Sequence, residues 1–380
     1  MKIVIAPDSF KESLTAQQVA QAIQQGFSDV IPEAEFIQLP VADGGEGTTS
    51  ALITSTQGTF YQTQVQDPLG QTVLATWGVL GDGKTAVIET AAASGLDLIP
   101  IDQRNPMITS SYGTGELIRA ALDQGATNII FGLGGSATND GGAGLLRALG
   151  AKLLDSAGHP LAPGGGSLHK LADLDISQLD QRLQHVTFKV ACDVDNPLLG
   201  PDGASSIFGP QKGASQTQVS RLDQNLEHFA QFLTRASGVD VRDIPGTGAA
   251  GGIGAALCAL FKTELQSGIE IVLNAVNFDQ HLKTADLVIT GEGSIDGQSL
   301  RGKTPVGVAK RAKAYNCPVI ALAGSVSPKQ APLQACGIDA IFSIVPGIVS
   351  LQNALEEAEL NLQNCARNLA TLWALGLRRT

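Results

Sequence analysis

The chain opens with a short apolar run, Ile3–Ile5, that shows no alternation with polar residues. This run predicts a buried strand, and a helix is predicted near Thr15–Phe27 with Thr15 as its N-cap. A second apolar run, Phe36–Leu39, leads into a glycine-rich loop. Strand, helix and strand in this order predict a βαβ unit, because apolar runs without alternation suit a parallel sheet covered on both faces.

The pattern changes after this unit. Segments rich in Val, Thr and aromatic residues, joined by turn sequences, predict an antiparallel meander of strands at Thr59–Gln66, Thr72–Val79 and Lys84–Glu89. We place the start of an inserted domain near residue 68. It continues with a predicted helix at Gly115–Gln124, a strand at Asn128–Phe131, a helix from about Asp140 and a strand around Phe188–Cys192.

The parallel pattern returns from Ala285. Buried strands are predicted at Asp286–Ile289, Pro318–Ala323 and Ala340–Ile344, with helices between them and one long helix over Leu351–Leu375. The chain is therefore predicted to be an α/β protein of two domains. One is a discontinuous parallel-sheet domain of residues 1–67 and 281–380, and the other is an inserted α/β domain of residues 68–280.

Composition narrows the class of protein. Of the 380 residues, 43% are hydrophobic and 16% are charged, which is a globular balance. The formal net charge of −11 argues against nucleic acid or an anionic membrane as a partner. The five cysteines are scattered without a CxxC pair, and no apolar run reaches membrane-spanning length, so we expect a cytoplasmic protein.

Glycine-rich motifs offer two interpretations of the site. Gly132–Ala137 fits GxGxxA between a strand and a helix, which is typical of a dinucleotide-binding loop and supports an NAD-dependent oxidoreductase. Thr138–Gly142 delay the helix and place a carboxylate where a pyrophosphate would lie, so a loop for the phosphates of a kinase is preferred. Gly78–Thr85 and Gly297–Thr304 both fit GxxxxGK[ST], but the first spans a hairpin and the second starts well beyond its predicted strand.

Carboxylates are the sharper signal. An open α/β sheet binds ligands at the carboxyl edge of its strands. Six carboxylates are predicted at or just past strand ends, namely Asp8, Asp43, Glu46, Asp193, Glu292 and Asp296. They are accompanied by the cations Lys11, Lys212, Arg301 and Lys303. Phosphoryl transfer needs this mixture, because carboxylates hold Mg²⁺ and accept a proton while cations neutralise the γ-phosphoryl oxygens. The isolated histidines do not predict a zinc site.

Several long motifs resemble the type 1 bacterial glycerate kinases. The matching stretches are Ala6–Ser13, Pro40–Thr48, Glu89–Leu96, Thr109–Glu116, Gly134–Gly144, Ala191–Pro197, Phe208–Ala214 and Gly291–Asp296. The resemblance runs from residue 1 to roughly 350. One departure is Glu12, where the family often has glycine.

The resemblance implies ATP- and Mg²⁺-dependent phosphorylation of D-glycerate, with 2-phosphoglycerate as the commoner product. It also implies a flavodoxin-like domain of residues 1–67 and 281–380 and an inserted mixed-sheet domain of residues 68–280 that resembles restriction endonucleases, with the active site in a cleft between them. A monomer or homodimer is expected.

Chemistry and loop position predict the residue roles. Asp193 is the predicted general base, with Asp296 as its rival. Lys11 or Lys303 would counter developing charge, and Arg301 or Lys212 would bind the glycerate carboxylate. Further contacts to substrate are expected from Ser9 and Asn196, contacts to ATP from Gly134, Gly135, Ser136, Asn139 and Asp140, and ligands to Mg²⁺ from Asp8, Asp43, Glu46 and Glu292. A non-catalytic sensor of a nucleotide or hydroxy acid is a third alternative.

Overall fold

The computed structural model describes residues 1–295, 303–327 and 335–377. These residues form two compact units. Unit 1 comprises Met1–Asp43, Ser50–Gln57 and the chain from Ile269 onward, and unit 2 comprises Gly44–Thr49 and Gly58–Gly268.

Unit 1 contains a five-stranded parallel sheet with the order β13-β12-β11-β1-β2. The strands are β1 (Lys2–Ile5), β2 (Glu35–Gln38), β11 (Leu287–Ile295), β12 (Val319–Val326) and β13 (Ala340–Ser343). Numbered along the chain within this sheet, the order is 2-1-3-4-5, which is that of a flavodoxin-like doubly wound sheet. The prediction of a parallel sheet built from both ends of the chain is confirmed.

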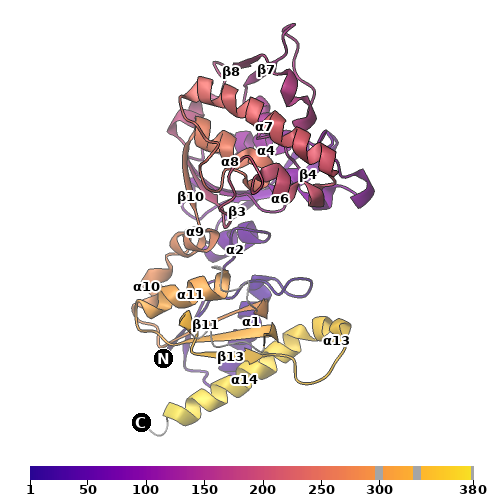
Figure 1. Cartoon of the computed structure of the whole chain (residues 1–380). Coiled ribbons are helices and arrows are strands. Elements are labelled where there is room, and N and C mark those ends of the chain that lie inside the picture. The colour runs from indigo at the N-terminus through magenta and orange to yellow at the C-terminus, as the bar shows by residue number, and fades with distance from the viewer. Residues whose placement is uncertain (296–302, 328–334, 378–380) are drawn as a thin grey trace. The chain divides into compact units, whose positions relative to one another are not determined.

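Helices of unit 1 pack on this sheet. Helix α1 (Ala16–Ser28) begins at Thr15, whose Oγ1 accepts a hydrogen bond from the N–H of Gln18 in a complete capping box, so the predicted N-cap is confirmed. Helix α14 (Ala358–Leu377) lies beside α1 (Figure 1). The other helices are α2 (Thr48–Ser55, whose first two residues belong to unit 2), α9 (Gly268–Ala275, whose first residue belongs to unit 2), α10 (Phe278–Leu282), α11 (Thr304–Lys313) and α13 (Leu351–Glu356). The single helix predicted over Leu351–Leu375 is therefore two, because the chain breaks at Glu357.

Unit 2 contains a six-stranded mixed sheet with the order β10-β9-β6-β5-β4-β3. Its strands are β3 (Thr59–Gln66), β4 (Thr72–Val79), β5 (Thr85–Glu89), β6 (Asn128–Gly132), β9 (Thr187–Ala191) and β10 (Lys262–Gln266). β3, β4 and β5 pair antiparallel, which confirms the meander. β5, β6, β9 and β10 run parallel, so the prediction of a second, mixed α/β sheet is confirmed.

Helices and a small second sheet cover the sheet of unit 2. The helices are α3 (Ala91–Ser94), α4 (Tyr112–Asp123), α5 (Ala143–Ala148), α6 (Ala204–Phe208), α7 (Gln216–Ser237) and α8 (Ala249–Leu260), and the small sheet pairs β7 (Lys152–Leu154) with β8 (Asp173–Asp175). Figure 1 labels α4, α7 and α8 in this unit. The core between these layers buries Phe131, Phe188 and Phe229 completely.

Two expectations about boundaries need correction. β3 pairs with β4, so residues 59–66 belong with unit 2 and not with the predicted segment 1–67. β11 extends to Ile295 instead of ending near Ile289, because Ser294 and Ile295 still pair with Ser325 and Val326 of β12.

Candidate functional site

In unit 2, the candidate site is built at the carboxyl edge of the parallel strands. Glu89 ends β5 opposite Gly132 of β6, and Gly132 in turn lies opposite Ala191 of β9. β5, β6 and β9 therefore end at the same edge of the sheet. The predicted residues Gly134, Gly135 and Ser136 lie just after β6, and Asp193 lies just after β9. This is the edge at which open α/β sheets bind their ligands.

The loop after β6 presents backbone donors. Gly134 and Gly135 are exposed, and within the described part of the chain their N–H groups donate to no acceptor. The loop is nevertheless fixed, because Leu96 donates its N–H to the carbonyl of Gly135 at 2.9 Å and Ala137 donates to Ser94 at 2.8 Å. Gly135 has a φ of +73°, a left-handed conformation that favours glycine. A fixed loop with free amides suits an anion such as a phosphate.

Lys212 lies beneath this loop and not on its surface. Its side chain is 2% exposed, and Nζ donates to Ser136 Oγ at 2.9 Å and to the Thr138 carbonyl at 2.7 Å. Burial lowers the pKa of Lys212 from 10.5 to about 7, although nearby Asp140 raises it. The predicted role of Lys212 as a direct clamp on a substrate carboxylate does not fit this geometry, because its ammonium group is directed at the chain itself.

Asn139 and Asp140 are also directed inward. Asp140 is fully buried, and its carboxylate accepts hydrogen bonds from the N–H and Oγ of Ser111 and from the N–H groups of Gly142 and Gly144. Burial raises the pKa of Asp140, and these hydrogen bonds lower it. Asn139 Nδ2 donates to Ser205 Oγ at 2.9 Å. Both side chains therefore hold the loop in shape, and they are not arranged to contact ATP as predicted.

Asp193 follows β9 and is exposed. Its Oδ1 accepts a hydrogen bond from the N–H of Gly268 at 3.1 Å, which fixes the carboxylate at the strand edge. Asn196, a predicted substrate contact, donates from Nδ2 to the carbonyl of Asp202 at 2.8 Å. Its backbone carbonyl accepts from Gly246 and Gly248, so Asn196 organises the loop after β9.

A second carboxylate at this edge was missed. Glu46 was predicted from the sequence and Glu89 was not, although Glu89 ends the predicted strand Lys84–Glu89 and meets the same strand-end criterion. Glu89 Oε1 accepts a hydrogen bond from the N–H of Thr49 at 2.7 Å. Burial raises the pKa of Glu89, and Glu46 nearby raises it further, while hydrogen bonds from Thr49 and Gly47 lower it. The two carboxylates therefore share one region of unit 2.

In unit 1, Asp8 lies at the edge where the strand order reverses. It follows β1, donates its N–H to Gly291 of β11 at 2.8 Å, and accepts on Oδ2 a hydrogen bond of 2.6 Å from Thr304 Oγ1. Ser9, a predicted substrate contact, donates its N–H to Asp8 Oδ1 at 2.6 Å. Burial raises the pKa of Asp8 from 3.8 to about 6, the hydrogen bond from Thr304 lowers it, and Asp43 raises it. Such a reversal point is where doubly wound sheets bind ligands.

Helix α11 brings a cation to this edge. Lys303 is its N-cap residue and directly precedes Thr304, which holds Asp8. Lys11 is exposed, and its backbone N is 3.4 Å from where a Cβ on Gly293 of β11 would lie. Glu292 is 8% exposed in the same strand. The structure thus brings Asp8, Lys11, Glu292 and Lys303 to one end of the sheet of unit 1.

The carboxylates of the described residues allow only a Mg²⁺ site with few protein ligands. Within residues 1–295, 303–327 and 335–377, no group of three or more His, Cys, Asp or Glu side chains could hold a metal ion by itself. Mg²⁺ commonly binds through one or two carboxylates, with waters and substrate phosphates as its other ligands. Asp8 and Asp43, which interact electrostatically, fit this smaller requirement.

Two predicted residues, Asp296 and Arg301, lie outside the described residues. Most of the motif Gly297–Thr304 lies there too. The spacing argument against it was wrong, because β11 continues to Ile295. In contrast, Gly78–Thr85 spans the hairpin between β4 and β5, as predicted.

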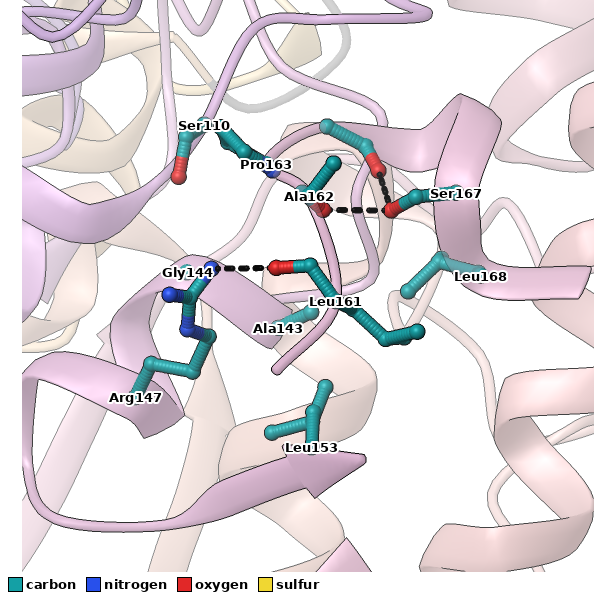
Figure 2. A pocket seen from close by; sticks show the side chains of 11 residues that line it. Ser110, Ala143, Gly144, Arg147, Leu153, Leu161, Ala162, Pro163, Ser167 and Leu168 are labelled. Carbon is teal, nitrogen blue, oxygen red and sulfur yellow. Dashed lines mark hydrogen bonds between the residues drawn. The ribbon is translucent and has the colours of Figure 1, made fainter. Parts of the chain in front are cut away.

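A small pocket elsewhere in unit 2 is not part of this site. It is lined by Arg147, Leu153, Leu161 and Leu168, among others, and it has room for about one water molecule (Figure 2). Arg147 Nη1 donates to the carbonyl of Leu161 at 3.1 Å across its wall. A space of this size does not suit a nucleotide.

Comparison with known proteins identifies the class. The chain is 56% identical over 378 residues to the glycerate 2-kinase of Escherichia coli (strain K12), covering 100% of this chain and 99% of the relative. It is also 56% identical to the glycerate kinase of Bacillus subtilis (strain 168), with 97% of each chain covered. A crystal structure from Salmonella typhimurium LT2, assigned as glycerate kinase 2, superposes with a TM-score of 0.92 at 52% identity and covers 100% of this chain and 99% of that one.

The fold and these relatives define a kinase. The chain belongs to the glycerate kinase family, whose family model matches residues 3–374. The resemblance noted from its motifs is thereby confirmed. Within the described residues, no helix is both long and apolar enough to cross a membrane.

Proposed function

We propose that the protein transfers the γ-phosphoryl group of ATP to D-glycerate, with the 2-hydroxyl as the favoured acceptor. The loop after β6 carries the proposal, because it offers the N–H groups of Gly134 and Gly135, which have no acceptor among the described residues, next to the buried ammonium group of Lys212. Backbone N–H donors beside a lysine give an acidic protein a local place at which an anionic substrate can bind. The name of the Escherichia coli relative, a glycerate 2-kinase, supports the substrate and the position.

Unit 2 would supply a phosphate-binding loop and a base. In unit 2, Gly134, Gly135 and Ser136 would hold phosphate oxygens, and Asp193 would accept the proton of the attacking hydroxyl. Asp193 suits this role because it is exposed and held by the N–H of Gly268. Asp296 remains the alternative base. A fixed, solvent-accessible carboxylate can remove a proton as the oxygen bonds to phosphorus.

In unit 1, Asp8 and Asp43 would hold Mg²⁺, with Glu292 as a further candidate ligand. Glu46, which belongs to unit 2, is also a candidate. The ion would supply charge neutralisation at the phosphate oxygens when bound. Thr304 positions Asp8, and Lys303 or Lys11 would offset negative charge that develops on the transferred group. Ser9 would remain close to Asp8 and would contact substrate through its hydroxyl.

The test is a coupled assay that measures ADP formation. We expect ADP release from ATP and Mg²⁺ to depend on added D-glycerate, and we expect omission of Mg²⁺ to abolish it. ATP consumption that does not change when glycerate is added would contradict the proposal. Tight binding of NADH, followed by its fluorescence, would instead support the oxidoreductase, and binding of glycerate without turnover would support the sensor.

Cytoplasmic location is also part of the proposal. All five cysteines are free thiols, which suits a reducing compartment. A monomer or homodimer is expected, and sedimentation of the purified protein would distinguish the two.

A further inference from the structure

Arg104 differs from the other arginines of unit 2 because, among the described residues, it has a buried side-chain N–H without an acceptor. It follows the short 3-10 turn η2 (Ile101–Gln103) and is half-buried. Its Nη2 donates to the carbonyl of Leu96 at 3.2 Å. Within the described residues, its Nε is buried without a hydrogen-bond acceptor, and no carboxylate lies within ion-pair distance of its guanidinium group. The unpaired Nε distinguishes Arg104 from Arg147, which is also half-buried and has no ion pair among the described residues.

The position of Arg104 is tied to the glycine loop. Leu96, whose carbonyl accepts from Arg104, donates its own N–H to Gly135 at 2.9 Å. One peptide segment thus connects the guanidinium group with the loop that carries the free amides. On the other side, Gly213 packs so closely on the backbone of Arg104 that a Cβ at Gly213 would lie 2.1 Å from the Arg104 carbonyl oxygen.

Lys212, next to Gly213, completes the arrangement. Its Nζ contacts Ser136 at the far end of the same loop. Lys212 therefore contacts the loop directly, whereas Arg104 is connected to it through Leu96, and the two side chains differ in what they can bind. Lys212 is directed at the chain, whereas most N–H groups of Arg104 have no acceptor among the described residues. Leaving a buried donor unpaired costs about 1–3 kcal/mol, so an acceptor is expected from outside the chain.

We propose that Arg104 binds the carboxylate of the hydroxy-acid substrate, a role that was predicted from the sequence for Arg301 or Lys212. The inference rests on the proposed function. The planar guanidinium fork matches a carboxylate in a bidentate arrangement, whereas single backbone N–H groups of a glycine loop suit phosphate oxygens. Arg104 would thus bind the carboxylate of the substrate, and the glycine loop would bind phosphate oxygens.

The experiment compares Arg104→Gln and Arg104→Lys with a matched control, Arg147→Gln. Arg147 is also half-buried in unit 2 and also donates to one backbone carbonyl, but it lines the small pocket in Figure 2. We expect Arg104→Gln to raise the KM for D-glycerate by about 10- to 100-fold, which is the effect of losing a charge-assisted pair. The KM for ATP should change less than about threefold. Arg104→Lys should fall between the wild type and Arg104→Gln, and Arg147→Gln should match the wild type.

A substrate without charge separates binding from structural support. Glyceramide, the neutral amide of glycerate, should be a much poorer substrate than glycerate for the wild type. In Arg104→Gln, the ratio of kcat/KM for glycerate to kcat/KM for glyceramide should be smaller than in the wild type. The expected decrease equals the factor by which the substitution lowers kcat/KM for glycerate. A purely structural role would lower both values together and leave the ratio unchanged.

Each alternative result overturns the inference in a recognisable way. A raised KM for ATP with an unchanged KM for glycerate would assign Arg104 to a phosphate of the nucleotide. Unchanged kinetics in both Arg104 variants, in a wild type that turns over glycerate, would refute the role of Arg104 alone. Absence of glycerate turnover in the wild type would refute the proposed function and this inference together. If Arg104→Gln fails to fold, as judged by circular dichroism, Arg104→Lys decides by the same KM comparison.

Discussion

The buried ammonium group of Lys212 makes a quantitative prediction about stability and pH. Because its pKa is lowered from 10.5 to about 7 by burial, the unfolded chain binds more protons than the folded chain between these pH values. Stability therefore rises with pH across this window. Below pH 7 both states are protonated, and the folded state bears the full cost of a buried charge.

The magnitude follows from the pKa difference. One pKa unit corresponds to about 1.4 kcal/mol, so the full cost is about 5 kcal/mol, and about 3 kcal/mol of it is relieved between pH 7 and pH 9.5. Lys212→Met removes the titrating group together with two hydrogen bonds, to Ser136 and Thr138. The loss of these bonds shifts the stability of the variant by a nearly constant amount, whereas the loss of the titration changes its slope with pH.

The assay is urea unfolding of the wild type and Lys212→Met at several pH values from 6 to 9.5. We expect the difference in free energy of unfolding, wild type minus Lys212→Met, to increase by about 3 kcal/mol between pH 7 and pH 9.5. Lys189→Met, which replaces an exposed lysine on β9, is the control, and no comparable change is expected there. Parallel curves for the wild type and Lys212→Met would refute the buried ammonium group.

Four further predictions concern the site and its loops. Asp193→Asn should lower kcat by about 10²- to 10⁴-fold, as for loss of a general base, and a loss of less than about tenfold in steady-state turnover would exclude that role. Lys303→Ala should raise the KM for ATP or lower kcat, and unchanged values of both would remove Lys303 from the site. Gly135→Ala should destabilise the protein by about 1–2 kcal/mol in thermal unfolding because its φ is +73°, whereas Gly134→Ala should cost less, and equal losses would contradict the strained loop. Glu12 has a φ of 64°, so Glu12→Gly should stabilise the protein by up to about 1 kcal/mol in urea unfolding, and a destabilised variant would show that this strain is unimportant.

The regular parts of the fold could be predicted from local patterns. β3 and β4 have the predicted bounds because their composition and the turn between them define both ends. β11 was predicted too short, because Gly291, Glu292 and Gly293 resemble a loop in the sequence and only pairing with β12 keeps them extended. Its full length depends on a contact between segments far apart in the chain.

In the candidate site, too, contacts between distant segments could not be predicted from the sequence. Strand-end position identified Asp8 and Asp193 correctly as edge residues, because that criterion is local. It could not show that Asp140 is held by Ser111 or that Lys212 is buried against Ser136, since these contacts join distant segments. Arg104 follows no strand, so its position near the loop appears only in the folded chain.

The account stands on the transfer of phosphate from ATP to the 2-hydroxyl of glycerate, and ³¹P NMR of the reaction mixture tests this directly. After incubation of the protein with ATP, Mg²⁺ and D-glycerate, we expect ADP and a new phosphate monoester whose proton-coupled resonance is a doublet, because the 2-carbon carries a single proton. A triplet, from the two protons of the 3-carbon, would contradict the 2-position. Spectra that show no new monoester would contradict the account itself.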